Sequence, residues 1–327
     1  MRRAAVVVAL GLAPLVLTGT LRAQGEPPAW AYAITPPPPA GAPAPKPAPP
    51  DTSPKQLPGS SRTFTLAEVR NMFGPADWFP EEHPAMPAIV ANGRQPEARA
   101  CAMCHYPNGK GRPENAPVSG LPVSYFVQTM NDFRNDLRKT GEPRKPQTNV
   151  MIQIAKAMTP EEIQASAEYY GSMKWTPWIR VVETAMVPKT RAVGGIWMPL
   201  AGNEQEPIGM RIIETPEDVG RADLRDPRSG FVAYAPVGSI RRGEALVTTG
   251  GNGRTVQCGV CHGADLNGLG PVPGIAGRSP SYLVRQMYDM KAGARQGEWA
   301  AMMKPVVDRL TDEDFVAIAA YVASRMP

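Results

Sequence analysis

Two stretches of the chain carry apolar residues at helical spacing, each directly after a capping signal. One opens at Thr159 with Thr-Pro-Glu-Glu and the other at Thr311 with Thr-Asp-Glu-Asp. In such a capping box the threonine and the acidic residue three positions later satisfy each other's backbone N–H groups, so both stretches are predicted helices. Their buried faces are predicted to be Ile163, Ala167 and Tyr170 in the first helix and Phe315, Ile318, Ala319 and Val322 in the second. A further box at Thr65 predicts that ordered structure begins near that residue.

The two helices belong to an internal repeat. Matching residues recur at an offset of 157 positions, the distance from Cys101 to Cys258. At this offset the segment Ser-Tyr-Phe-Val at 124–127 matches Ser-Tyr-Leu-Val at 281–284, and Met130 matches Met287. Short helices, glycine- and proline-rich loops and few strand signals favour an all-α fold, in two copies of one small domain.

The segments outside the repeat differ in composition. Residues 1–24 begin with Met-Arg-Arg, followed by an apolar run and small residues, which is typical of a cleaved secretory signal peptide; an uncleaved membrane anchor is the alternative. The predicted boundaries are a signal peptide at 1–24, a proline-rich disordered linker at 25–61, a first domain at 62–173, an irregular connector at 174–237 and a second domain at 238–327. The connector contains Trp175, Trp178 and Trp197, so we expect it to pack on the domains and fix their geometry.

Charge excludes one class of function. The formal net charge is +5, and removing Arg2, Arg3 and Arg22 with the signal peptide leaves 32 basic and 30 acidic residues, or +2. Nucleic-acid-binding proteins carry a much stronger basic excess, so no nucleic acid is expected as a partner.

The candidate chemistry lies in two pentapeptides, Cys-Ala-Met-Cys-His at 101–105 and Cys-Gly-Val-Cys-His at 258–262. They contain every cysteine and two of the three histidines of the chain. Cys-x-x-Cys-His is the attachment motif of c-type haem, in which both thiols bind the porphyrin and the histidine binds iron. A thioredoxin-like redox pair is less compatible with two copies, and zinc ribbons have their cysteine pairs much closer in sequence. We therefore predict two covalently bound haems through Cys101, Cys104, Cys258 and Cys261, with His105 and His262 as axial ligands.

With these motifs the chain resembles the class I cytochromes c, in the tandem arrangement of the cytochrome c-four group. The resemblance covers roughly residues 85 to 172 and 238 to 326. It implies that a methionine before the last helix of each domain is the sixth iron ligand, which maps onto Met151 and Met303, each eight residues before a helix-capping threonine. It also implies a proline carbonyl that orients the histidine ring, Pro273 in the second domain and Pro117, beside the offset partner Ala116, in the first. Tyr125 and Tyr282 are further candidates for residues that surround the haems.

The resemblance implies an electron-transfer protein rather than an enzyme, with redox proteins as electron donor and acceptor, no small-molecule substrate, and a location in the periplasm. His83 is the one histidine outside the motifs, and its neighbours suggest a surface loop; both irons therefore cannot have two histidine ligands. The alternatives are a dihaem peroxidase, which needs an open iron position, and a permanent haem subunit of a periplasmic dehydrogenase.

A basic segment before Met151 gives one more hypothesis. It contains Arg134, Arg138, Lys139, Arg144 and Lys145. Redox encounters use small interfaces steered by charge, so this segment is predicted to guide an acidic partner to the first haem; a solvated loop is the alternative.

Overall fold

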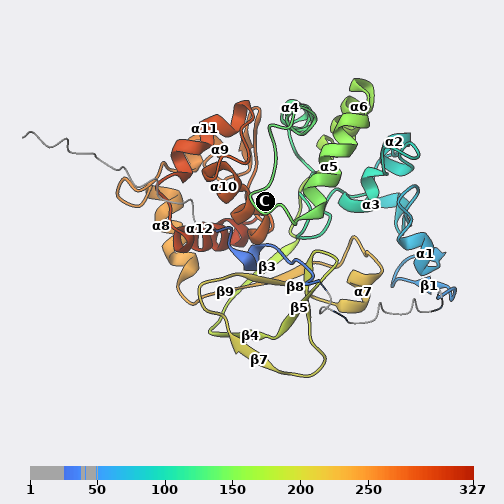
Figure 1. The fold of residues 1–327 in the computed structure, drawn as a ribbon, viewed down its shortest axis with the longest axis horizontal. Coiled ribbons are helices and arrows are strands. Elements are labelled where there is room, and N and C mark those ends of the chain that lie inside the picture. The colour runs from blue at the N-terminus through green and yellow to red at the C-terminus, as the bar shows by residue number, and fades with distance from the viewer. Residues whose placement is uncertain (1–25, 38–40, 42–48, 50) are drawn as a thin grey trace, which may run out of the picture.

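The computed structural model describes residues 26–37, 41, 49 and 51–327. The predicted signal peptide at 1–24 lies outside the described residues. The fold has two helical domains side by side and a β-rich segment below both of them (Figure 1). Among the described residues, no helix combines the length and the apolar character needed to cross a membrane.

The first helical domain forms around α4 and the two helices that follow it. Its helices are α2 (Ala88–Ala91), α3 (Cys101–His105), α4 (Val123–Arg134), α5 (Pro146–Ala157) and α6 (Pro160–Gly171). Thr159 and Glu162 form the predicted capping box of α6. The predicted inner face of α6 is buried, with Ile163 and Tyr170 packed beside Phe126 of α4. This domain holds the first Cys-x-x-Cys-His motif on α3.

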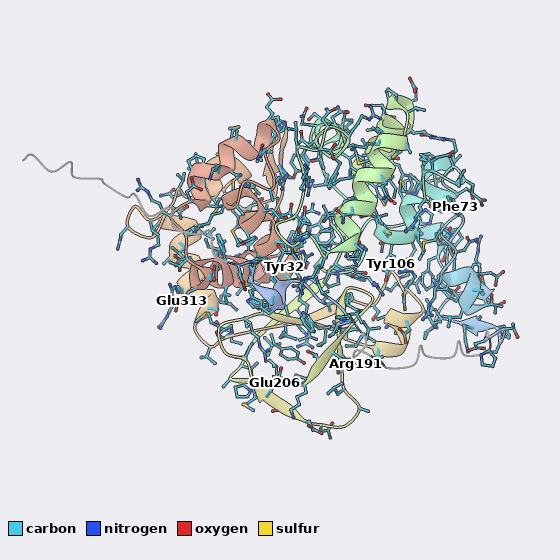
Figure 2. All side chains as sticks on the ribbon, in the orientation of Figure 1. Tyr32, Phe73, Tyr106, Arg191, Glu206 and Glu313 are labelled. Carbon is cyan, nitrogen blue, oxygen red and sulfur yellow. The ribbon has the colours of Figure 1, made fainter. Side chains whose placement is uncertain are left out.

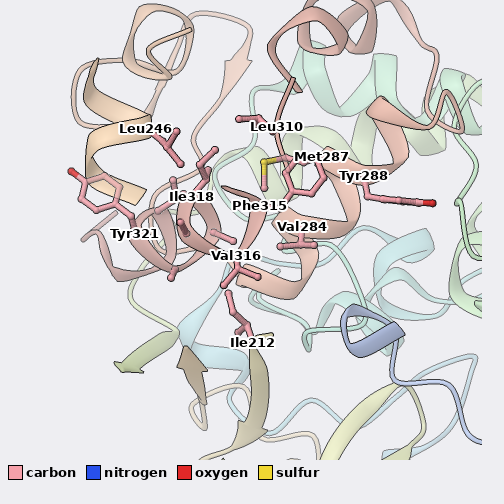
Figure 3. Packing of buried hydrophobic residues seen from close by; sticks show 14 of the residues in the cluster. Ile212, Leu246, Val284, Met287, Tyr288, Leu310, Phe315, Val316, Ile318 and Tyr321 are labelled. Atoms are coloured by element: carbon pink, nitrogen blue, oxygen red, sulfur yellow. The ribbon is translucent and has the colours of Figure 1, made fainter. Parts of the chain in front are cut away.

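The second helical domain repeats this arrangement with tighter packing. Its helices are α8 (Ser239–Thr249), α9 (Gly259–His262), α10 (Pro280–Lys291), α11 (Glu298–Val307) and α12 (Asp312–Ser324). Thr311 and Asp314 cap α12, as predicted. Figure 3 shows Phe315, Val316 and Ile318 of α12 among Leu246, Val284 and Leu310. Gly243 allows α8 to cross α12 closely, because a Cβ there would overlap the carbonyl oxygen of Ala317.

The connector contains regular β structure, so the predictions of an all-α chain and an irregular connector are wrong. A three-stranded sheet has the order β3 (Ile179–Glu183), β9 (Phe231–Ala235), β8 (Ile213–Pro216), with β3 parallel and β8 antiparallel to β9. Two antiparallel pairs extend from it, β4 (Met186–Pro188) with β7 (Gln205–Pro207) and β5 (Thr190–Val193) with β6 (Ile196–Pro199); α7 (Val219–Asp223) precedes β9. Strands β8 and β9 are buried along almost their whole length. Their sequences therefore lack the alternation of apolar and polar residues that marks a half-exposed strand, and the sequence did not predict them.

The connector joins both helical domains, as its tryptophans predicted. Ala233 and Ala235 of β9 belong to the core of the second domain. Trp175 and Trp178 are buried, and Trp175 donates a hydrogen bond from Nε1 to the carbonyl oxygen of Ala276 at 3.0 Å. Trp175 and Trp178 also pack against Tyr106 of the first domain, so the connector contacts both helical domains.

The described part of the proline-rich segment is also packed, so the prediction of a disordered linker is wrong there. Around the short helix η1 (Ala29–Ala31), Trp30 and Tyr32 contact the core of the second domain, and Tyr32 is 4% exposed (Figure 2). Leu57 is buried with Val69, Trp78 and Phe79 in a small separate core. The elements of that core are β1 (Lys55–Gln56), β2 (Thr63–Phe64), α1 (Leu66–Val69), with the predicted capping box at Thr65, and η2 (Pro80–Glu82).

Candidate haem sites

Each Cys-x-x-Cys-His motif forms a single short helical turn that ends at the histidine. In the first motif α3 carries Cys101, Cys104 and His105, and in the second Cys258 directly precedes α9, which carries Cys261 and His262. Burial raises the pKa of the Cys101 and Cys258 thiols to about 11. Thioredoxin-like pairs require a lowered thiol pKa, so this environment argues against that alternative.

Each histidine is oriented through its Nδ1 atom. Nδ1 of His262 lies 2.8 Å from the carbonyl oxygen of Pro273, the expected hydrogen bond. Nδ1 of His105 lies 2.8 Å from the carbonyl oxygen of Ala116, so the expectation for Pro117 is wrong by one residue. Burial lowers the pKa of both imidazoles. A neutral ring that donates from Nδ1 keeps the Nε2 lone pair for a metal ion.

Two adjoining cavities lie beside these histidines, and a predicted methionine lines each. The first, of about 90 Å³, is lined by His105, Met151 and apolar groups that include Phe126. The second, of about 190 Å³, is lined by both Cys258 and Cys261 together with His262 and Met303. Leu121, Tyr282 and Gln286 line both cavities. Thiols, an imidazole, a thioether and apolar walls are the groups that a c-type haem requires, and the second cavity has all of them. The first cavity has the imidazole, the thioether and the apolar walls, whereas Cys101 and Cys104 do not line it but lie on the same helical turn as His105. These residue types fit the cofactor.

Comparison with known proteins decides the family. The family model described as cytochrome c matches residues 90–174 and 240–325. The chain belongs to the cytochrome c family. A chain with two such domains carries two covalently bound c-type haems, in the tandem class I arrangement of the cytochrome c4 type.

Several relatives share this arrangement in part. Cytochrome c4 of Azotobacter vinelandii is 37% identical over 84 residues, which are 24% of this chain and 40% of that protein. Cytochrome c-554(548) of Halomonas halodenitrificans is 40% identical over 76 residues, 23% of this chain and 92% of its own length. A protein named thiosulfate dehydrogenase electron acceptor, from Thiomonas intermedia, is 24% identical over 235 residues, 70% of this chain and 80% of that protein. Among solved structures, a thiosulfate dehydrogenase of Marichromatium purpuratum is similar with a TM-score of 0.47 and 26% identity, over 71% of this chain and 38% of that one.

Tyr125 and Tyr282 lie where the two cytochrome c domains meet. Tyr125 lines the cavity of the opposite domain, and its hydroxyl accepts a hydrogen bond from Nη2 of Arg295 at 2.9 Å. The hydroxyl of Tyr282 accepts one from Nη2 of Arg138 at 3.2 Å. Burial alone raises the pKa of Tyr125, whereas Arg295 and Arg138 lower it, and the resulting pKa is about 8. Each domain thus supplies an arginine to the tyrosine of the other.

Sequence reasoning missed the pairing of these arginines. Arg138 and Arg295 stand at the repeat offset of 157 positions, as Tyr125 and Tyr282 do, and the same self-comparison could have found them. Both guanidinium groups also donate to Oε1 of Gln286, each at 2.9 Å. The signal would have been a basic residue that recurs with the tyrosine helix of each domain.

Part of the basic segment before Met151 packs on the second domain, so Arg138 and Lys145 are not available to guide a partner; docking through the exposed Lys139 and Arg144 stays a prediction. Arg138 and Lys145 are buried. The backbone N–H of Lys139 donates to the carbonyl oxygen of Ala294 at 2.8 Å. Arg144 is exposed but paired with Glu142, and Arg134 donates to carbonyl oxygens at the end of α5. Most of these positive charges serve internal contacts.

His83 does not line either haem cavity. Its Nε2 atom lies 3.2 Å from Oδ1 of Asp77, and its Nδ1 atom lies 3.0 Å from the hydroxyl of Tyr169. The side chain is 5% exposed, so the expectation of a surface loop is wrong for the imidazole. The hydrogen bond with Asp77 raises the pKa of His83. This histidine links the N-terminal core to α6.

Proposed function

We propose that the chain is a periplasmic dihaem cytochrome c that carries electrons between protein partners. The observation that supports this most is that each cavity brings a motif histidine and a methionine to one space. Histidine and methionine together fill both axial positions of a haem iron and raise its reduction potential. A dihaem peroxidase would need an open iron position, so this alternative is less compatible with the lining residues.

The roles of the residues follow from their chemistry. Cys101 and Cys104 would bind the first haem, and Cys258 and Cys261 the second, by thioether bonds. His105 with Met151, and His262 with Met303, would be the axial ligands. When bound, each haem supplies a site that takes up and releases one electron. The protein would hold each imidazole in one orientation, bring a thioether to the same cavity and surround the cofactor with apolar groups that exclude water.

The partners and the location belong to this proposal as well. Residues 1–24 have the pattern of an export signal, and c-type haem fits an extracytoplasmic compartment, which supports a periplasmic location. The relative named thiosulfate dehydrogenase electron acceptor spans most of this chain. We therefore propose a periplasmic dehydrogenase as electron donor, a thiosulfate dehydrogenase being the first to test, and a redox protein as acceptor.

Replacement of the two methionines tests the ligand assignment. Met151→Ala and Met303→Ala should each remove about half of the near-infrared sulfur-to-iron band of the ferric protein and lower one reduction potential, because each change opens one iron. The control is Met326→Ala, which removes a methionine that is 71% exposed and lines neither haem cavity, and which should leave the band unchanged. Mass spectrometry of the denatured parent should find two covalent haems. Full band intensity in Met303→Ala, or a single haem per chain, would contradict the proposal.

A further inference from the structure

The two haem attachment motifs are equivalent in sequence but differ sharply in exposure. Met103 and Val260 occupy the same position between the cysteines, and their exposed fractions are 5% and 63%. Cys104 is half-buried, whereas its counterpart Cys261 is exposed. Only the second motif therefore presents its haem-binding turn to solvent.

The chain itself covers the first motif. Nη2 of Arg225, in the connector, donates to the carbonyl oxygen of Met103 at 2.7 Å, and its guanidinium group lies over the ring of Tyr106. Tyr106, which Figure 2 labels, is 3% exposed. It packs with Trp175, Trp178 and Phe231 of the connector. These contacts bury the turn in a folded interface.

Hydrogen bonds also hold the connector against the first motif. Nδ2 of Asn108 donates to the carbonyl oxygen of Pro227 at 2.9 Å, and Nη2 of Arg112 donates to that of Gly194 at 3.0 Å. The backbone N–H of Ala100 donates to the carbonyl oxygen of Met72, which lies in the N-terminal segment, at 3.0 Å. The counterpart of Arg112 in the second domain is Leu269, which is 60% exposed.

The second motif is surrounded by an exposed surface that is mostly apolar. We call this surface the second-motif face; its residues are Val256, Val260, Cys261, Leu269 and Met302. Val256, Cys261 and Met302 also line the second haem cavity, so the face borders the cofactor site. In the segments 256–274 and 299–303 the one residue among Asp, Glu, Lys and Arg is the exposed Asp265. Contiguous exposed apolar surface on a soluble protein commonly marks an interaction site.

We propose that the second-motif face is the place where the chain exchanges electrons with its partners, and that these partners present an uncharged, apolar surface around their own redox centre. The first haem then exchanges electrons through the second, across the wall of Leu121, Tyr282 and Gln286 that both cavities share. This proposal rests on the proposed function. Redox encounters bury small areas, and a face whose segments contain a single charged residue gains little from electrostatic steering. Association should therefore depend weakly on salt.

Electron self-exchange between oxidised and reduced copies of the holoprotein tests this proposal, because a second copy offers the same apolar face. One electron leaves a reduced copy and enters an oxidised copy, so the reaction balances without another reagent. NMR line broadening of the haem methyl signals gives its rate. In the parent, we expect the rate to change less than about twofold between 0.01 and 0.3 M salt.

Val260→Lys should slow self-exchange about tenfold at low salt, because two like charges then meet at the contact, and added salt should restore part of the rate. The matched control is Val237→Lys, which places the same charge on an exposed valine (73% exposed) at the end of the connector and should leave the rate unchanged. Equal rates in the two variants would overturn the proposal. An intact sulfur-to-iron band in both variants shows that the proposed function stands independently of this result.

A measurement without electron transfer tests the difference in exposure directly. An uncharged gadolinium chelate should increase the nuclear relaxation rate of the second haem's methyl groups at least about twice as much as that of the first haem's. The paramagnetic relaxation rate falls steeply with distance from the gadolinium ion, and the chelate stays in the solvent. Equal relaxation of both haems would overturn the proposal. Sedimentation of the oxidised parent should find a monomer; a lasting dimer that Val260→Lys dissociates would show that a second copy occupies the face, and would likewise overturn it.

Discussion

At the residue scale, Asp289 is a carboxyl group whose protonation is coupled to folding. It is 4% exposed, and its Oδ1 atom accepts a hydrogen bond from the backbone N–H of Gly141 at 2.7 Å. The hydroxyl of Tyr32 lies 3.4 Å from the same atom. Burial raises the pKa of Asp289 to about 6, although the bond from Gly141 lowers it. The folded state therefore binds a proton at pH values where the unfolded chain has released it.

Asp289→Asn should change the pH dependence of stability. A raised folded-state pKa gives stability that is complete below the unfolded pKa of about 3.9 and is lost as pH rises through about 6. The amide keeps an acceptor for Gly141 but no longer carries a charge, so the variant should be more stable than the parent at pH 7 by about 1–3 kcal/mol. Denaturant unfolding of the holoprotein from pH 4 to pH 8 measures this.

The control for this comparison is Glu81→Gln, which removes an exposed carboxylate. It should unfold with the same pH dependence as the parent. Parallel curves for Asp289→Asn and the parent between pH 4 and pH 7 would show that Asp289 is not responsible.

At the element scale, the crossing of α8 and α12 depends on a missing side chain. A Cβ at Gly243 would overlap the carbonyl oxygen of Ala317 and would lie 2.7 Å from Cβ of Tyr321. Ten consecutive residues of α12, Asp314 to Ala323, are buried, so the helix has little room to move away. The second haem domain therefore requires glycine at this position.

Gly243→Ala should lower the free energy of unfolding by about 1–3 kcal/mol, the usual cost of adding a methyl group to a packed contact. Thermal unfolding of the holoprotein measures the change. Gly220→Ala is the matched control, since Gly220 lies in α7 and a Cβ added there would have no neighbouring atom closer than 3.4 Å, so alanine should be neutral or slightly stabilising. A Gly243→Ala variant as stable as Gly220→Ala would show that the crossing of α8 and α12 tolerates an added methyl group, and would contradict the prediction.

At the scale of the whole molecule, the reciprocal arginine–tyrosine pairs hold the two haem domains together. Arg138 of the first domain binds Tyr282, and Arg295 of the second binds Tyr125. The two arginines also face each other in an antiparallel backbone bridge. Arg295 is 7% exposed and Tyr125 is 8% exposed, so the hydrogen bond between them is protected from water and its loss should cost stability.

The double variant Arg138→Met, Arg295→Met should uncouple the domains. Each lost arginine removes charge-assisted hydrogen bonds worth about 1.5–3 kcal/mol, so the single cooperative calorimetric transition expected of the parent should separate into two. Arg144→Met is the matched control, because its side chain lies in the same segment but is 72% exposed. A single transition in the double variant, with an unchanged midpoint, would show that the pairs do not couple the domains.

The sequence by itself determined the features that depend on short-range spacing. A helical turn and a haem attachment site each involve only a few consecutive positions, so the sequence shows the Cys-x-x-Cys-His turns and the capping boxes at Thr159 and Thr311 directly. The repeat at 157 positions follows from comparing such short segments with each other. The capping boxes predicted the last helix of each domain, and the Cys-x-x-Cys-His motifs indicated the family.

The tertiary structure alone decided the features that depend on contacts between distant residues. The sheet pairs β3 with β9 across the whole connector, and Trp30 packs on a domain far along the chain. Folding also determined that Ala116 rather than Pro117 accepts from His105, and that Arg138 turns inward. The same motif is buried at Met103 and exposed at Val260, because exposure depends on what the rest of the chain places over a surface, and local sequence does not record that.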